Sequence, residues 1–244
     1  MHKLFIPIIF ILFITACNTA ETPKNEPTQN VQQDSTAVVN DPKSFLNIQA
    51  TSFTEIDTSG ILLFPLSMGE TTRDNDYTSY KSMPGNTHWN IAFYNTKTGE
   101  QHLLSDNKML IKNYSLQYQG DATPKGNGKN IFYAITTEDF NGDKKFTEAD
   151  ATYLFMSDKA GNNLKQISPS NYNVQNWQYI ATSNKIIMTL RKDSDKNKIF
   201  DTKDEVTNFV YDMNKGEAAT EIFSTELKNK LKVLYDKDWK KIKN

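Results

Sequence analysis

The stretch IFYAITTEDFNGDKKFTEAD, residues 131–150, has a second copy downstream, IIMTLRKDSDKNKIFDTKD, residues 186–204. Each copy opens with an apolar run rich in β-branched and aromatic residues, then enters an acidic loop. Such runs, bounded by polar turn residues, predict β-strands. The two copies therefore predict a repeated unit of strand, acidic loop and strand. Its offset is 54 positions, shared by three residue pairs: Asp139 and Asp193, Asp150 and Asp204, and Phe155 and Phe209.

Further strands extend each unit. A Gly-bearing turn ends its second strand, at 158–163 and at 212–216, and a short β-prone segment follows. A third, degenerate copy lies upstream, where Phe93 matches Phe155 at an offset of 62. Each unit thus has about four strands. The expected flanking strands are 53–56, 61–66, 89–94, 101–104, 115–118, 164–167, 177–181 and 219–223.

Units of about 55 residues with four antiparallel strands are typical of propeller blades. We therefore expect an all-β fold of three blade-like antiparallel repeats, at about 50–110, 111–170 and 171–224. The segments TYLFMSDKAGNNLKQIS (152–168) and NIAFYNTKTGEQHLL (90–104) resemble the outer strands of TolB-like propeller repeats. That resemblance implies a blade fold and no activity. Three blades are too few to close a ring, so a partial propeller-like stack or a twisted meander is expected.

Near the C-terminus the spacing of the apolar residues becomes helical. Leu227, Leu231 and Leu234 recur at helical spacing, and Ser224 stands where an N-cap belongs. We expect a helix over 225–243 that packs on the open edge of the β-domain. A helix that binds a partner is the alternative.

The N-terminal residues predict export and a lipid anchor. The apolar run from Leu4 to Phe13 is too short to span a bilayer and fits the core of a signal peptide, residues 1–16. The residues ITAC that end at Cys17 resemble the lipobox of bacterial lipoproteins. This implies a Cys17 carrying acyl chains such as palmitate, and Asn18, in place of Asp, implies the outer membrane. The sequence does not indicate on which face of that membrane the protein lies. The polar stretch 17–44 is expected to be a disordered tether to the folded part, 45–244.

The two acidic loops predict calcium sites. Calcium takes six to eight oxygen ligands, and both loops place oxygen donors at positions 1, 3, 5, 7, 9 and 12 of the EF-hand pattern. They resemble the calcium loops of integrin α-subunit propellers, because strands and not helices flank them. Lys144 and Lys198 stand where the sixth position normally has Gly. The expected ligands are Asp139, Asn141, Asp143, the Lys145 carbonyl, Thr147 and Asp150 in the first loop, and Asp193, Asp195, Asn197, the Ile199 carbonyl, Asp201 and Asp204 in the second.

The composition and the absence of catalytic motifs from the sequence reduce the number of function classes that fit the chain. With 28 basic and 29 acidic residues, the chain has no basic excess for nucleic-acid binding. Neither His88 nor His102 has metal-binding spacing, and both are expected at strand ends or on the surface. No phosphate loop, nucleophile elbow or CxxC occurs in the sequence. We expect the chain to be a calcium-stabilised binding or scaffold module with a protein or glycan partner, and not an enzyme. An envelope hydrolase and an accessory subunit of an envelope complex are the alternatives.

The lipid anchor is tested by Cys17→Ser, which removes the thiol that carries the acyl chains. The variant is expected to leave the membrane fraction or to accumulate with its signal peptide uncleaved, as fractionation and immunoblotting will show. Normal cleavage with unchanged membrane retention would contradict the anchor.

Overall fold

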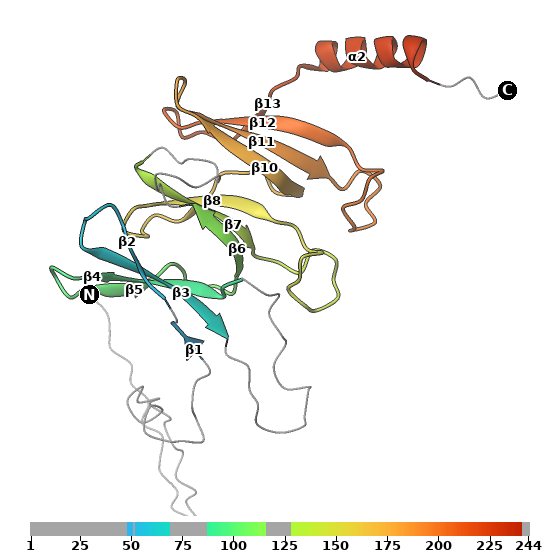
Figure 1. The fold of residues 1–244 in the computed structure, drawn as a ribbon. Helices are drawn as coiled ribbons and strands as arrows, with labels where there is room; N and C mark the ends of the chain where they lie inside the picture. The colour runs from blue at the N-terminus through green and yellow to red at the C-terminus, as the bar shows by residue number, and fades with distance from the viewer. Residues whose placement is uncertain (1–47, 51, 69–86, 116–127, 241–244) are drawn as a thin grey trace, which may run out of the picture. The chain divides into compact units, whose positions relative to one another are not determined.

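The computed structural model describes residues 48–50, 52–68, 87–115 and 128–240. Cys17, the expected signal peptide and the expected tether lie outside these ranges. Within them, the chain forms three antiparallel sheets and one helix (Figure 1). No described helix is long and apolar enough to cross a membrane.

The first sheet is four strands wide, although it contains five strands. Both β1 and β2 pair with the same edge of β3, β1 near Met68 and β2 near Leu63. The central strand β3 then pairs with β4, and β4 with β5. The strands are β1 Ile48–Gln49, β2 Thr54–Glu55, β3 Ile61–Met68, β4 Asn90–Asn95 and β5 Gln101–Leu103.

The second and third sheets are four-stranded meanders in chain order. The second contains β6 Leu110–Ser115, β7 Asn130–Thr136, β8 Tyr153–Asp158 and β9 Lys165–Gln166. The third contains β10 Tyr172–Ile180, β11 Lys185–Lys192, β12 Val206–Asp212 and β13 Thr220–Glu221, followed by α2 Thr225–Asp238. The expected fold class, three blade-like antiparallel repeats with a C-terminal helix, is confirmed, and the sheets do not close into a barrel.

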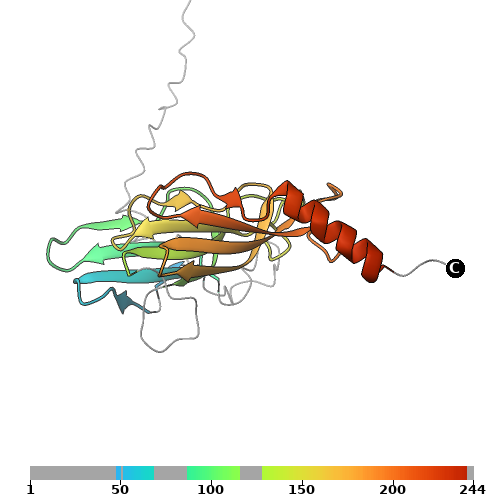
Figure 2. The same ribbon diagram turned by 90° about the horizontal axis from the view of Figure 1, so that it is seen from above.

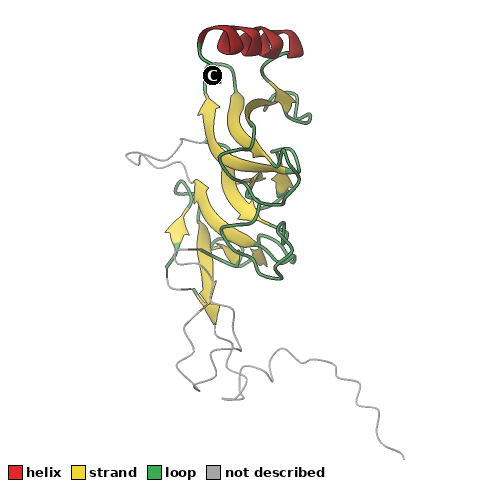
Figure 3. Ribbon diagram, turned by 90° about the vertical axis from the view of Figure 1, so that its right-hand side faces the viewer, coloured by secondary structure: helices red, strands yellow, loops and turns green. Residues whose placement is uncertain are grey.

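The second sheet is buried on both faces. In β7 every residue from Ile131 to Thr136 is buried. Because side chains alternate between faces along a strand, Ile131, Tyr133 and Ile135 pack against Leu63, Ile91 and Phe93 of the first sheet. Phe132 and, from β8, Leu154 and Met156 pack against Ile186, Met188 and Leu190 of the third. Figures 2 and 3 show the resulting stack of sheets from above and from the side.

The first two sheets approach closely at Gly161, in the turn between β8 and β9. Gly161 has φ +81°, and a Cβ placed on it would lie 2.3 Å from the ring of Phe93. This contact joins a turn of the second sheet to the core of the first. Only a residue without a side chain fits there without moving the ring.

The first repeat has a different register from the one expected. In β4, Phe93 faces the second sheet, whereas Phe155 of β8 faces the first. The turns give the true correspondence, because Asn95 and Asp158 each accept a hydrogen bond from the backbone N–H two residues on. The offset is therefore 63, and Phe93 corresponds to Met156. A one-residue shift moves a side chain to the opposite face of a sheet. An offset of 62 would therefore pair Phe93 with a residue that points in the opposite direction along the stack.

Two other expectations are corrected. The strand expected at 115–118 begins earlier, because β6 starts at Leu110; residues 116–118 of the expected range lie outside the described residues. The C-terminal helix forms with Ser224 as its N-cap, whose side chain accepts a hydrogen bond from the N–H of Leu227. It does not pack on the β-domain as expected, because none of the residues of α2 is buried.

Gly161→Ala and Gly99→Ala form a matched pair that tests the stacking. Gly99 also has a positive φ, +77°, but a Cβ there meets nothing within 4 Å. We expect Gly99→Ala to cost about 1–2 kcal/mol of unfolding free energy for the left-handed backbone. Gly161→Ala should cost about 1–3 kcal/mol more, because the methyl group overpacks the Phe93 ring. Urea unfolding of the full chain measures both, and equal costs would contradict the close approach.

Candidate metal centre in two acidic loops

Two acidic loops lie at corresponding places in neighbouring sheets. Loop one, residues 139–150, connects β7 to β8, and loop two, residues 193–204, connects β11 to β12. Both lie on the same side of the stack (Figures 1 and 3). They touch through the stacked rings of Phe140 and Phe200, whose centroids are 4.7 Å apart. The stacking of the sheets thus brings the two loops together.

The aspartates at the twelfth position close each loop. The two oxygens of Asp150 accept hydrogen bonds from the backbone N–H groups of Phe140 at 2.9 Å and Thr147 at 2.8 Å. Asp204 accepts from Ser194 at 2.8 Å and Asp201 at 2.9 Å. These donors occupy positions 2 and 9 in both loops. Both carboxylates are buried, with 0% and 7% of their surface exposed, so each is the inner anchor of its loop.

The aspartates at the first position bend the chain around themselves. Asp139 accepts hydrogen bonds from the N–H groups of Asp143 at 3.0 Å and Lys144 at 2.6 Å. Asp193 accepts from the corresponding donors, Asn197 and Lys198, both at 3.1 Å. A carboxylate that accepts from positions 5 and 6 forces a tight turn between them. Both loops make the same turn.

The sixth position adopts the backbone that glycine normally provides. Lys144 has φ 66° and Lys198 has φ 63°. A non-glycine residue in this left-handed region costs about 1 kcal/mol. The departure from Gly noted in the sequence therefore changes the residue and leaves the shape of the loop intact.

The remaining ligand positions are also equivalent. At position 3, Asn141 and Asp195 each accept from the N–H of position 5, at 2.9 and 3.1 Å. Position 5 accepts from the N–H of position 7 in both loops, at 2.8 and 2.7 Å. Position 9 accepts from position 11, at 3.2 and 2.7 Å. The residues are Asp143, Lys145, Thr147 and Ala149 in loop one and Asn197, Ile199, Asp201 and Lys203 in loop two.

Three carboxylates converge in loop two. Asp193, Asp195 and Asp204 each offer an oxygen, and these three oxygens lie within 4.8 Å of one another. Among the described residues, this is the one group of three or more His, Cys, Asp or Glu side chains whose ligand atoms all lie within that distance of one another. In loop one, an amide, Asn141, takes the place of Asp195. At position 5 the exchange is reversed, Asp143 against Asn197, and at position 9 loop one has Thr147 where loop two has Asp201. Loop two therefore has four carboxylates at its ligand positions and loop one has three.

A basic side chain lies near the buried aspartate of each loop. In loop one, burial lowers the pKa of the Lys112 ammonium, while the negative charges of Glu148 and Asp150 oppose that shift. Its Nζ donates to the Thr152 hydroxyl at 2.7 Å. In loop two, Arg191 donates to the Asp201 carbonyl. Each cation offsets part of the negative charge at the base of its loop.

Sequence reasoning missed these supporting residues. Lys112 occupies a β-bulge of β6, which no local pattern signals. The contact between Phe140 and Phe200 joins residues 60 positions apart and depends on how the sheets stack. Phe146, at position 8 of loop one, lies half-buried with the Lys108 ammonium 4.1 Å from the centre of its ring, and Phe200, at position 8 of loop two, lies half-buried against loop one.

The histidines lie in or beside the sheets and not in the loops. His88 lies two residues before β4, its backbone bridges Ile111 of β6, and its Nδ1 lies 3.2 Å from the Ser67 hydroxyl. Burial lowers the pKa of the His88 imidazole. His102 lies in β5 with its ring 5.2 Å from that of Phe93. Both are therefore packing residues of a sheet, and neither joins the acidic cluster.

Comparison with known proteins adds no family: no protein-family model and no curated protein matches the chain. A functional conclusion therefore depends on the geometry of the loops.

The pKa of Asp204 gives a pH test of the loop. The N–H groups of Ser194 and Asp201 hold the pKa of this carboxyl below its ordinary value of 3.8, assisted by the charge of Arg191 and opposed by burial. Because the folded pKa is depressed, its stabilising effect is present above about pH 4 and is lost as the pH falls through the folded pKa. Asp204→Asn should therefore lower the urea midpoint at pH 7, and the difference from wild type should shrink at lower pH. An equal difference from pH 7 to about pH 2.5 would refute this role of the charge.

Proposed function

We propose that the two acidic loops bind calcium and that the protein is an envelope lipoprotein whose β-repeat domain is stabilised by that ion. The observation that carries the proposal is the position-by-position match between the loops. The same backbone donors bond to the same ligand positions in both, and three carboxylates converge in loop two.

The donor set fits calcium. Each loop offers oxygens at six positions, which is within the six to eight that calcium takes. An ionised carboxylate has about four lone-pair sites, so Asp193 and Asp204 keep acceptor capacity beyond their backbone hydrogen bonds. The described donors are carboxylate, amide, hydroxyl and carbonyl oxygens. Magnesium should substitute poorly, because it needs a smaller, nearly octahedral shell.

Charge repulsion explains why an ion would stabilise the fold. The oxygens of Asp193, Asp195 and Asp204 lie within 4.8 Å of one another. Like charges at such distances repel, and a divalent cation between them converts the repulsion into attraction. Loop two, with four carboxylates at its ligand positions, should bind more tightly than loop one, which has three.

The module is proposed to bind a protein or glycan at the cell envelope, to which acyl chains on Cys17 attach it. The support for the anchor is the signal-like sequence ending at Cys17. Loops that calcium holds rigid, on one side of a sheet stack, offer a surface for such a partner. No described feature favours the hydrolase or the accessory subunit over this role.

Thermal unfolding of the full chain tests calcium binding. Sites of the extracellular type bind at about 10⁻⁴–10⁻³ M, so about 5 mM calcium should stabilise the fold by about 1–2 kcal/mol per site relative to chelator. Asp195→Ala should remove more of this shift than Asn141→Ala does, and the double variant should lose it entirely.

Glu148→Ala is the matched control. Glu148 is an exposed acid within loop one that occupies no ligand position, so its loss should leave the calcium shift unchanged. If wild type melts at the same temperature in calcium and in chelator, the loops are ordinary acidic turns and the proposal fails.

A further inference from the structure

The first sheet has an apolar face that no described sheet covers. Because Leu63, Ile91 and Phe93 point to the second sheet, the alternate residues of β3 and β4 lie on the opposite face. Strand pairing places Leu103 beside Ala92 on that same face, and the ring of Phe53 lies 5.7 Å from that of Phe64. We call this surface the outer face of the first sheet; it consists of Phe53, Leu62, Phe64, Ala92, Tyr94 and Leu103.

The corresponding face is covered in the other two sheets. At an offset of 63, Ala92 corresponds to Phe155, which packs against the first sheet. The neighbouring strand β7 turns Ile131 and Tyr133 to the same side, and both are fully buried. In the outer face of the first sheet, by contrast, Phe53 is 63% exposed and Leu103 is 41% exposed. Exposed apolar patches of this kind mark interaction sites.

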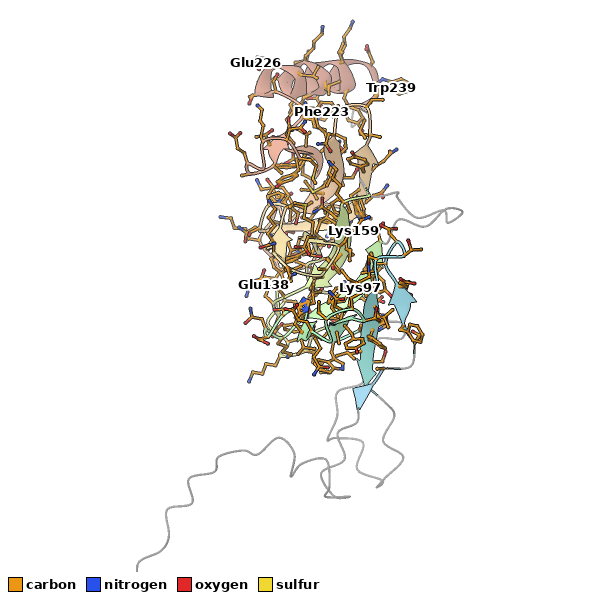
Figure 4. The ribbon with its side chains drawn as sticks, turned by 90° about the vertical axis from the view of Figure 1, so that its left-hand side faces the viewer. Lys97, Glu138, Lys159, Phe223, Glu226 and Trp239 are labelled. Atoms are coloured by element: carbon orange, nitrogen blue, oxygen red, sulfur yellow. The ribbon has the colours of Figure 1, made fainter. Side chains whose placement is uncertain are left out.

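The other end of the stack carries a second uncovered apolar surface, on α2. Leu227, Leu231 and Leu234 follow the i, i+4, i+7 spacing that places them on one stripe of the helix. They are 40%, 48% and 45% exposed. Figure 1 draws α2 beyond the third sheet, on the side away from the first two, and Figure 4 labels Glu226 and Trp239 at its two ends.

The two surfaces have opposite charge. Residues 224–240, which contain α2, carry five Lys against three acidic residues, a net charge of +2. The described residues around the outer face, 52–68 and 87–104, carry Glu55, Asp57 and Glu100 against Lys97. Because Asp57 pairs with Lys159 of the second sheet, the charge left around the outer face is −1. Lysines also border the apolar stripe on both sides, Lys230 and Lys237 on one and Lys228 and Lys232 on the other. An apolar stripe edged by Lys matches an apolar face in a region of net negative charge.

The helix cannot reach the outer face within its own chain. Three residues, 222–224, separate β13 from α2, and they span at most about 11 Å. Stacked sheets lie about 10 Å apart, and the outer face is two sheets away from the third. Lys228 further ties the start of α2 to Glu205 and Glu221 of the third sheet region. The α2 helix of the same chain is therefore not the occupant of the outer face.

We propose that α2 of one copy of this chain docks on the outer face of the first sheet of a second copy. The contact is head-to-tail, since each copy offers its helix at one end and its sheet face at the other. Repeated from copy to copy, such a heterologous contact builds a row, or a ring where the rotation closes. The inference is independent of calcium binding.

Two tagged full-length copies, co-expressed and extracted in mild detergent, test the contact by co-purification. Wild-type copies should recover each other. Leu103→Lys in both copies, or Leu231→Lys in both, places a charge in the contact and should lower the recovery about tenfold or more. A Leu103→Lys copy with a Leu231→Lys copy keeps one native contact, because the intact helix of the first meets the intact face of the second. That mixture should recover more than either variant pair, which also shows that both variants fold.

Val233→Lys is the matched control. Val233 lies on the same helix, away from the stripe, and is 66% exposed, so this variant should associate as wild type does. Loss of association by Leu103→Lys alone would indicate a face-to-face contact between first sheets, and loss by Leu231→Lys alone a contact between helices or with lipid. Either result, or no recovery between wild-type copies, overturns the proposal.

Discussion

The burial of both faces of the second sheet is the constraint on which the rest of the structure depends. A strand with a water-facing side would alternate apolar and polar residues. In β7 the run from Ile131 to Thr136 is buried throughout, so a sheet must cover each face. The first sheet covers one face and the third covers the other. The stack of three sheets follows from this, and the neighbouring position of the two acidic loops follows from the stack.

The loops meet two demands with the same side chains. Aspartates and asparagines that accept backbone N–H groups satisfy the donors of a tight turn, and turns of this kind form without a metal. Such turns would not require the carboxylates of Asp193, Asp195 and Asp204 to converge, because like charges resist convergence. The proposed cation would account for this convergence.

Much of this could be predicted from the sequence, because it depends on local patterns. Apolar runs marked the central strands, and the offset of 54 between Asp139 and Asp193 marked equivalent loops. The errors arose where tertiary packing decides. An offset of 62 pairs Phe93 with Phe155 by residue type, but the faces and turns require 63. The spacing of Leu227 and Leu231 predicted the helix but not its exposure. The contact of Phe140 with Phe200 needed the stacked sheets, and the bulge that holds Lys112 has no sequence signal.

The repeat is proposed to place an equivalent cation site in each of two sheets. Calorimetric titration of the full chain with calcium counts these sites directly. Two bound ions per chain are expected, with the tighter site lost in Asp195→Ala. Absence of binding, or a tighter site that persists when Asp195 is replaced, would contradict the proposal.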